Sequence, residues 1–295
     1  MAKVLIIGSG PAGVSAALYT ERAGLDTMVL SKGSGALARA EKIQNYYGFD
    51  EPVSGAELEN MGIEGAKKLG VEFVEDEVVW LGMNDQLTGF IVRTSSTQYE
   101  ADCVIVAAGA MRKTVKLPGI AEFEGKGVSY CATCDGFFYR GKIVSVLGVG
   151  EYALHEAETL LPYAEKVMLF THGEEPAANF PARIEIHKEK IQAIEGDGRV
   201  HGIRLADGSL VPTDGVFVAY GVAGSADMAR KIGAALDADG HVIVDKDMAT
   251  NIPGLYAAGD CTGGILQVAK SVYQGAAAGL AAARYLRSRA DKTKK

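Results

Sequence analysis

A glycine-rich turn lies close to the start of the 295-residue chain, directly after the apolar run Lys3–Ile7. It has the spacing Gly-x-Gly-x-x-Gly, with Gly8, Gly10 and Gly13 at the fixed positions. In this pattern the first glycine permits a tight turn, the second lets a pyrophosphate approach the backbone, and the third lets a helix pack closely on a strand. A second apolar run, Thr27–Leu30, completes a βαβ unit. The sequence therefore predicts a parallel sheet with a dinucleotide site at the helix N-terminus.

A second turn of the same kind lies near the middle of the chain. Residues 142–147 read as a strand that leads into Gly148, Gly150 and Ala153, and a helix is expected to continue to about Leu161. We therefore predict an α/β protein with two nucleotide-binding domains of the Rossmann-like, three-layer kind. The first domain is expected to be discontinuous, with residues 1–113 and 247–295 split around an inserted domain of residues 114–246.

Short runs rich in β-branched and aromatic residues follow the first βαβ unit. Residues 71–74, 78–81, 90–94 and 98–101 have the length and composition of antiparallel strands. An apolar run that begins at Cys103 comes next, and we interpret this cysteine as a small buried hydrophobic residue.

Charge and composition exclude several classes of protein. The net charge of −7 gives no whole-chain basic footprint for nucleic acid. No apolar run approaches the roughly 20 residues that a membrane-spanning helix needs. Four cysteines are too few for an extracellular disulfide framework, and the N-terminus lacks the pattern of a signal peptide. We expect a cytoplasmic protein whose partners are neither nucleic acid nor membrane.

Cys131 and Cys134 form a Cys-x-x-Cys pair, which carries the clearest indication of chemistry. At this spacing one thiolate can attack a disulfide while the other resolves the mixed disulfide. The alternative is half of a zinc site, but such a site needs four ligands. The other two cysteines, Cys103 and Cys261, stand alone, and no histidine pair at ligand spacing lies nearby. The pair therefore favours redox exchange.

Three motifs together resemble the low-molecular-weight thioredoxin reductases. They are Gly8–Gly13, Cys131–Gly136 and Pro253–Asp260, in this order and separation, and the likeness covers essentially the whole chain. The resemblance implies a flavoprotein with a FAD domain split around a domain that carries the redox-active disulfide. It also implies a homodimer that reduces thioredoxin or a thioredoxin-like protein.

The same resemblance implies the roles of individual residues. Cys134 would face the flavin, Cys131 would attack the substrate disulfide, and Asp135 would exchange the proton. The alternative for Asp135 is a turn or helix-capping residue. The residues that the resemblance assigns to FAD are Gly8, Gly10, Pro11, Ala12, Gly13, Asn45, Val78, Ala108, Gly109, Gly259, Asp260, Gln267 and Val268.

The sequence departs from the family pattern where a pyridine nucleotide would bind. Members that use NADPH carry arginines just after the second strand of the inserted domain, where they clamp the 2′-phosphate. Here the stretch from Phe170 to Pro176 contains Glu174 and Glu175 and no cation before Arg183. Glu151 at the second glycine turn would repel a pyrophosphate. The alternative for this turn is that its glycines serve only close packing.

The first domain also departs from the usual pattern. After its second strand, Ser31-Lys32 replaces the usual ribose-binding acid.

These departures favour an electron donor other than NADPH. Residues 35–37 and 151–157 resemble the ferredoxin-dependent flavin thioredoxin reductases of anaerobic bacteria. An acidic ferredoxin would need a local basic patch on this acidic chain, which Arg284, Arg287 and Arg289 could supply; a solvated helix end is the alternative. Ferredoxin is thus the leading donor and NADPH the second. A non-catalytic flavoprotein or redox-sensing module is the alternative from another class.

Overall fold

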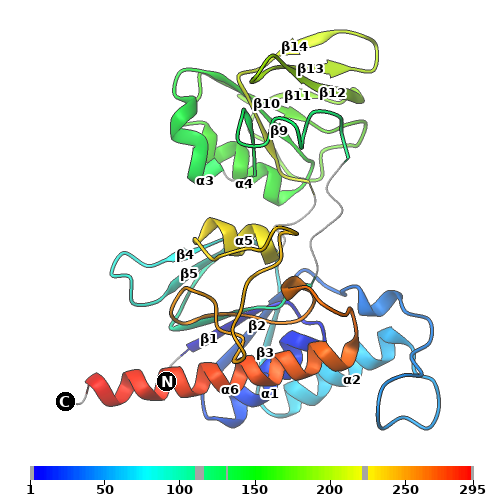
Figure 1. Cartoon of the computed structure of the whole chain (residues 1–295), viewed down its shortest axis with the longest axis vertical. Helices are drawn as coiled ribbons and strands as arrows, with labels where there is room; N and C mark the ends of the chain where they lie inside the picture. The colour runs from blue at the N-terminus through cyan, green and yellow to red at the C-terminus, as the bar shows by residue number, and fades with distance from the viewer. Residues whose placement is uncertain (1–2, 110–115, 131, 221–224, 294–295) are drawn as a thin grey trace. The chain divides into compact units, whose positions relative to one another are not determined.

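The computed structural model describes residues 3–109, 116–130, 132–220 and 225–293, and the chain forms two compact units (Figure 1). The first unit comprises Met1–Met111 and Gly224–Lys295, and the second comprises Arg112–Ala223. The chain thus leaves the first unit and returns to it, as the sequence indicates. The return lies at residues 223–224 and not at the predicted 246–247, so that boundary was wrong by 23 residues.

The segment 224–246 belongs to the first unit because of its own contacts. Helix α5, Ser225–Lys231, packs on strand β4, Val78–Met83. The side chain of Asn251 accepts a hydrogen bond from the Ala235 amide (2.8 Å) and donates one to the Gly233 carbonyl (3.0 Å). Neither contact has a signature in the sequence, since one is tertiary packing and the other a single side chain.

A five-stranded parallel sheet forms the centre of the first unit, in the order β16-β7-β1-β2-β3. Helices α1, α2 and α6 cover one face of this sheet (Figure 1). The bounds are β1 Lys3–Ile7, β2 Asp26–Ser31, β3 Glu72–Glu75, β7 Cys103–Val106, β16 Leu255–Ala257, α1 Pro11–Arg22, α2 Gly55–Lys68 and α6 Val268–Thr293. Strand β3 pairs in parallel with β2, so its prediction as an antiparallel strand was wrong. A four-residue strand is too short for composition to reveal its direction.

Helices α1 and α6 pack very closely. A Cβ atom added to Gly275 would lie 2.1 Å from the Ala12 carbonyl oxygen, and one added to Gly279 would lie 2.7 Å from that of Ala16. These glycines bring the backbone of α6 against the first turns of α1, beside the glycine turn. Strands β4, β5 (Phe90–Thr94) and β6 (Gln98–Ala101) form a separate antiparallel sheet.

The second unit repeats the parallel arrangement with the order β11-β10-β9-β15-β8. Helix α4 covers β9 and β10, while apolar residues of the antiparallel sheet β12-β13-β14 pack against the same strands in one core. The bounds are β8 Val128–Ser129, β9 Ile143–Leu147, β10 Lys166–Phe170, β11 Glu185–His187, β12 Ile191–Gly196, β13 Val200–Leu205, β14 Leu210–Pro212, β15 Gly215–Val218, α3 Ala132–Asp135, η2 Gly136–Tyr139 and α4 Glu151–Leu160. The predicted fold class is confirmed.

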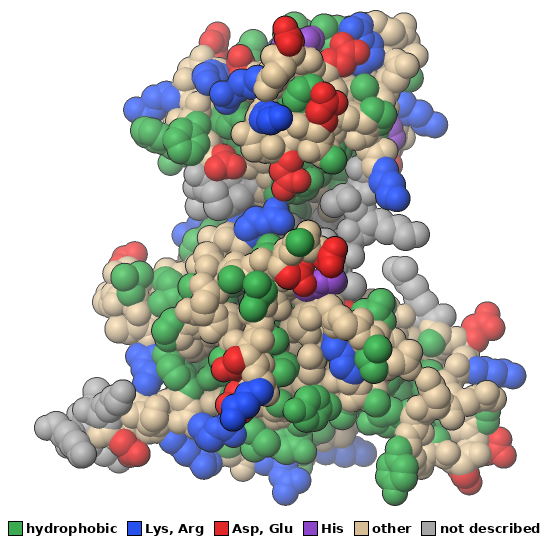
Figure 2. Space-filling model, viewed as in Figure 1, with side chains coloured by type: hydrophobic (Ala, Val, Ile, Leu, Met, Phe, Trp, Pro, Cys, Tyr) green, Lys and Arg blue, Asp and Glu red, His purple; other side chains and the backbone are tan. Residues whose placement is uncertain are grey.

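Among the described residues, none of the helices is both long and apolar enough to span a bilayer. On the face drawn in Figure 2, cations and carboxylates are interspersed over both units.

Candidate cofactor and redox sites

The first glycine turn is shaped by close backbone packing at two of its glycines. Gly8 has a φ of +113°, and a Cβ atom there would lie 2.4 Å from the Ala107 carbonyl oxygen. A Cβ atom on Gly13 would lie 1.8 Å from the Gly8 carbonyl oxygen. Both positions therefore require glycine, as the sequence pattern predicts.

Gly10 differs, because no atom of the described residues lies within 4 Å of a Cβ atom added there. It is the N-cap of α1, no described side chain caps the helix, Pro11 is the first helical residue, and the first turn contains no acid. The space beside Gly10 at this helix end is thus open, and the first turn of α1 contributes no carboxylate to it. This open cradle fits a pyrophosphate.

Two other predicted segments lie at the same edge of the sheet. Ala108 and Gly109 follow β7, and no described atom lies within 4 Å of a Cβ atom added to Gly109. Gly259 and Asp260 follow β16, and a Cβ atom on Gly259 would lie 2.9 Å from that of Ala12. Because the carboxyl ends of parallel strands share one edge, these residues and the glycine turn border one site.

Asn45 and Gln267 also come together, although they are 222 residues apart in the sequence. The Asn45 side-chain amide donates a hydrogen bond of 2.9 Å to Gln267 Oε1. Val268 is the first residue of α6, while Val78 is buried at the start of β4. The residues that the resemblance assigned to FAD thus belong to one unit, with the two amides in contact.

Polar residues of α6 that sequence reasoning missed support the Gly259–Asp260 turn. Lys270 Nζ donates to the carbonyl oxygens of Gly259 (3.0 Å) and Gly263. Gln274 Oε1 accepts from the Gly259 amide at 2.9 Å. The available signal was their spacing, since polar side chains at 267, 270 and 274 follow one face of an otherwise alanine-rich helix.

An acid is present near the end of β2 even though the sequence there reads Ser31-Lys32. Glu77, which precedes β4, is buried, and its carboxylate forms an ion pair with Lys32 Nζ. The carboxylate therefore comes from the connection between β3 and β4, where a motif search along β2 could not find it.

The predicted redox pair belongs by sequence to the second unit, Arg112–Ala223. Cys131 falls outside the described residues, and Cys134 is part of α3, where only its backbone is described. Asp135 ends this helix and accepts a hydrogen bond of 2.7 Å from Ser129 Oγ. It is also the N-cap of η2, but its side chain makes no capping bond. The side chain of Asp135 is thus directed to β8, which the capping interpretation does not explain.

An exposed aromatic pair follows Asp135 and Gly136 directly. The side chains of Phe137 and Phe138 are 61% and 66% exposed. The Arg140 guanidinium lies 5.1 Å from the centre of the Phe137 ring. Large exposed aromatic residues beside a cation commonly mark a protein-binding surface.

The second glycine turn is closed by contacts within the protein. A Cβ atom on Gly148 would lie 2.3 Å from the Ala219 carbonyl oxygen and 2.7 Å from Ala153 Cβ. Helix α4 begins with Glu151, and Tyr152 in its first turn is 2% exposed. Gly148 therefore has a packing reason, which supports the alternative given for this turn.

The loop after β10 folds back onto that turn. The Ala177 amide donates to the Val149 carbonyl at 2.7 Å, and Thr171 Oγ1 donates to the Glu174 carbonyl at 2.5 Å. The carboxylates of Glu174 and Glu175 are exposed, and Lys188 forms a 2.5 Å ion pair with Glu175. Lys188 is a cation that sequence reasoning overlooked because it follows the loop in the sequence and meets it in space.

The three arginines considered as a basic patch have partners within the first unit. Arg284 forms an ion pair of 2.9 Å with Asp247. Arg287 donates to the Ala23 carbonyl, and Arg289 donates to that of Thr88. His155 is a half-buried residue of α4.

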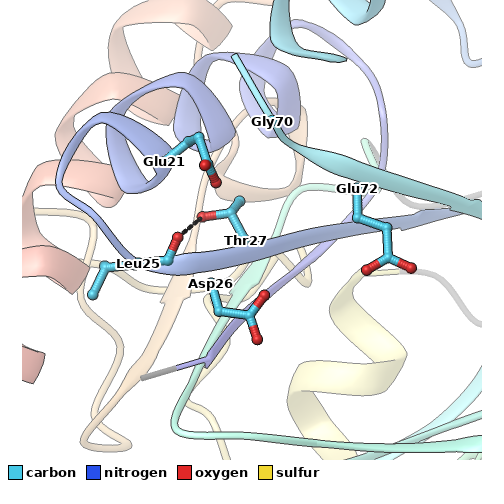
Figure 3. A pocket seen from close by; sticks show the side chains of 6 residues that line it. All are labelled: Glu21, Leu25, Asp26, Thr27, Gly70 and Glu72. Carbon is cyan, nitrogen blue, oxygen red and sulfur yellow. Dashed lines mark hydrogen bonds between the residues drawn. The ribbon is translucent and has the colours of Figure 1, made fainter. Parts of the chain in front are cut away.

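A shallow hollow lies at the opposite edge of the first sheet, where β2 begins (Figure 3). Its lining includes the carboxylates of Glu21, Asp26 and Glu72, and Thr27 Oγ1 donates to the Leu25 carbonyl at 3.3 Å. No cation or thiol lines it among the described residues. None of the predicted site residues is among the residues that line the hollow.

Comparison with known proteins places these features in context. The model of the pyridine nucleotide-disulphide oxidoreductase family matches residues 2–275. A thioredoxin reductase of Listeria monocytogenes is 34% identical over 96% of this chain and 93% of its own. The crystal structure of the atypical thioredoxin reductase of Desulfovibrio vulgaris Hildenborough superposes with a TM-score of 0.92 at 40% identity, covering 98% of this chain and 99% of that one. A ferredoxin-flavin thioredoxin reductase of Clostridium acetobutylicum gives a TM-score of 0.74 at 34% identity, with 97% and 98% covered.

Proposed function

Because the chain belongs to the pyridine nucleotide-disulphide oxidoreductase family and to its thioredoxin reductases, we propose that it reduces thioredoxin with electrons from ferredoxin. FAD is the cofactor of this family. When bound, FAD supplies one-electron and two-electron transfer. The open amides at Gly10 would hold its pyrophosphate, and Asp260 would accept a hydrogen bond from a hydroxyl group of its ribityl chain.

The redox chemistry of the protein itself is assigned to Cys131 and Cys134. The Cys131 thiolate attacks one sulfur of the thioredoxin disulfide, and a mixed disulfide forms as the substrate bond breaks. Cys134 then attacks Cys131, which releases thioredoxin as a dithiol that has gained two electrons and two protons. Asp135, hydrogen-bonded to Ser129, is the nearest titratable side chain in sequence and would move one of these protons.

We assign thioredoxin docking to the exposed Phe137 and Phe138. Only Asp135 and Gly136 separate them from Cys134 in the sequence, so a protein bound to them would dock beside the segment that carries the Cys-x-x-Cys. Arg140 beside them offers a cation to an acidic partner. The proposal includes a cytoplasmic location, where thiols are kept reduced.

The proposal that ferredoxin is the electron donor rests mainly on the loop after β10. It is bonded to the second glycine turn through Ala177 and Val149, and it presents Glu174 where a 2′-phosphate would approach. Glu151 adds a second carboxylate in the first turn of α4. Ferredoxin is energetically sufficient, because the step from about −400 mV to about −270 mV is worth roughly 6 kcal/mol for two electrons. The likeness to a protein described as a ferredoxin-flavin thioredoxin reductase supports the same donor.

NADPH remains the second candidate, and the Lys188–Glu175 ion pair favours it, because it neutralises one of the two carboxylates of the loop. The donors are distinguished by mixing the oxidised flavoprotein anaerobically with millimolar NADPH or NADH, and separately with chemically reduced ferredoxin. We expect flavin absorbance to bleach at a catalytically relevant rate only with ferredoxin. Rapid bleaching by NADPH would refute ferredoxin as the donor and identify the protein as an ordinary NADPH-dependent enzyme. Turnover rates decide the matter, because an accessible flavin accepts electrons slowly from many donors.

The same assay separates an enzyme from a non-catalytic module. After bleaching by dithionite, oxidised thioredoxin should restore the flavin colour of an enzyme. A flavin that stays reduced after thioredoxin is added identifies a module that does not pass electrons on.

We also propose a homodimer formed through the first unit. Its α6 carries the exposed apolar side chains of Tyr273 and Leu280, and Tyr19 of the neighbouring α1 is 41% exposed. Light scattering after size-exclusion chromatography tests this, and a mass of one chain would contradict it.

A further inference from the structure

Two side chains of helix α4 form hydrogen bonds with the backbone of the residues before and after Cys131. Tyr152 Oη donates a hydrogen bond of 3.3 Å to the Tyr130 carbonyl. Glu156 Oε2 accepts one of 2.7 Å from the Ala132 amide. The two residues are one helical turn apart, so one face of α4 holds both neighbours of this cysteine.

Both side chains are excluded from water. Tyr152 is 2% exposed and Glu156 is 1% exposed. A carboxylate is rarely retained in such a place unless hydrogen bonds compensate for its lost hydration, and here the Ala132 amide supplies one. Its burial and its short hydrogen bond indicate that Glu156 is a structural part of the segment that carries the cysteine.

These contacts give α4 a role other than nucleotide binding. In a nucleotide-binding unit the first turn of this helix faces phosphates. Here that turn contains Glu151 and the buried Tyr152, and the next turn contains Glu156. The helix therefore serves the Cys-x-x-Cys segment.

The charge of Glu156 has a consequence for the thiols. A carboxylate one residue away from Cys131 opposes formation of a thiolate there. Oxidation to the disulfide removes the thiolate, so the same charge favours the oxidised form. The other carboxylate near the pair, Asp135, is bonded to Ser129. A dithiol whose reduced form is destabilised is the stronger reductant.

We propose that Glu156 is a positioning residue that makes the Cys131/Cys134 dithiol a stronger reductant, and that Tyr152 completes the support of the segment. The inference rests on the proposed function, because it requires this pair to be the redox couple. It assigns a role to a residue of the second glycine-turn helix that a nucleotide-binding interpretation does not provide.

The test measures the equilibrium of the pair with glutathione. One dithiol reacts with one oxidised glutathione to give the protein disulfide and two reduced glutathiones, so two electrons and two protons leave the protein. The fraction oxidised is read by thiol alkylation and mass spectrometry across a series of glutathione ratios. For Glu156→Gln, which keeps an acceptor for the Ala132 amide, we expect the equilibrium constant for oxidation to fall about tenfold, or about 30 mV.

Glu158→Gln is the matched control, since it removes the same charge from an exposed position of the same helix. We expect its equilibrium constant to stay within about twofold of the parent value. Tyr152→Phe removes a hydroxyl but no charge, so its constant should also stay near the parent value. A tenfold shift in either variant would overturn the charge argument.

An unchanged equilibrium constant in folded Glu156→Gln would overturn the inference. If that variant does not fold, Glu156→Asp retains the charge but withdraws it by one methylene, and a threefold shift in the same direction is expected. An Asp variant with the parent constant would also refute the proposal. Failure of the parent protein to form the Cys131–Cys134 disulfide would instead refute the proposed function, so the two failures are distinguishable.

Discussion

Gly10→Ala should separate cofactor binding from folding at the first glycine turn. Gly10 has a φ of −72° and a ψ of −178°, which any residue adopts, and no described atom lies within 4 Å of the added Cβ. In the apoprotein the substitution should therefore stabilise the fold by about 0.4–1 kcal/mol, because alanine has less freedom in the unfolded chain. For a chain of this size that gain raises the melting temperature by about 1–4 °C.

FAD binding should change in the opposite direction. The added methyl group occupies the open space at the α1 N-terminus, so the pyrophosphate cannot approach the amides as closely. We expect the dissociation constant to rise at least about tenfold, equivalent to about 1.4 kcal/mol. Apoprotein melting followed by circular dichroism and titration with FAD followed by flavin fluorescence give the two quantities.

Gly65→Ala is the control for this experiment. Gly65 lies within α2, has no described atom within 4 Å of an added Cβ, and is distant in sequence from the turn. It should stabilise the apoprotein by about 1 kcal/mol through helix propensity and leave FAD affinity unchanged. FAD affinity of Gly10→Ala equal to that of the parent would refute the assignment of the pyrophosphate site.

Three further predictions address the redox segment and the effect of pH. Cys131→Ser should leave a Cys134 thiolate beside oxidised FAD and give a long-wavelength charge-transfer band, whereas Cys134→Ser should not; thioredoxin reduction by both at the parent rate would make the pair structural. Phe138→Ala should raise the KM for thioredoxin about fivefold or more, equivalent to about 1 kcal/mol, without slowing turnover of a small disulfide, and an unchanged KM would exclude docking there. Burial tends to raise the pKa of Asp76, but hydrogen bonds led by Ser95 outweigh it and leave the pKa below its usual value of 3.8. The resulting stability is present above about pH 4 and is lost as pH falls through the lowered pKa. Asp76→Asn should therefore lower the melting temperature at pH 7 and lower it progressively less as the pH falls below 4, and an effect of the same size at every pH would contradict this sign.

The parts of the fold that the sequence predicted are those set by local pattern. Gly8 and Gly13 have no room for a Cβ, so their spacing identifies the turn directly. The order of the motifs likewise predicted a chain that leaves the first unit and returns to it. The return point escaped prediction because it depends on α5 packing against β4 and on the side chain of Asn251.

The residues around the first glycine turn show the same division. Gly259 and Asp260, which the resemblance assigns to FAD, follow an apolar strand in a recognisable motif, whereas Glu77 reaches Lys32 from the connection between β3 and β4. Lys188 forms an ion pair with Glu175, from which it is 13 positions away in the sequence. Contacts that close through space leave no fixed spacing in one sequence, so a search for cations within the loop could not reveal Lys188.

The second glycine turn shows why a motif alone does not establish a ligand. Its spacing matches the first turn, and Gly148 is required by packing in the same way as Gly8. The difference lies in the helix that follows, because α1 begins with Pro11 and has no acid in its first turn, while α4 begins with Glu151 and directs Tyr152 and Glu156 to the redox segment. A helix N-terminus whose first turn is open and uncharged can receive a phosphate. In α4 the side chains of the first two turns are instead bonded to the backbone of Tyr130 and Ala132, on which the role proposed for Glu156 rests.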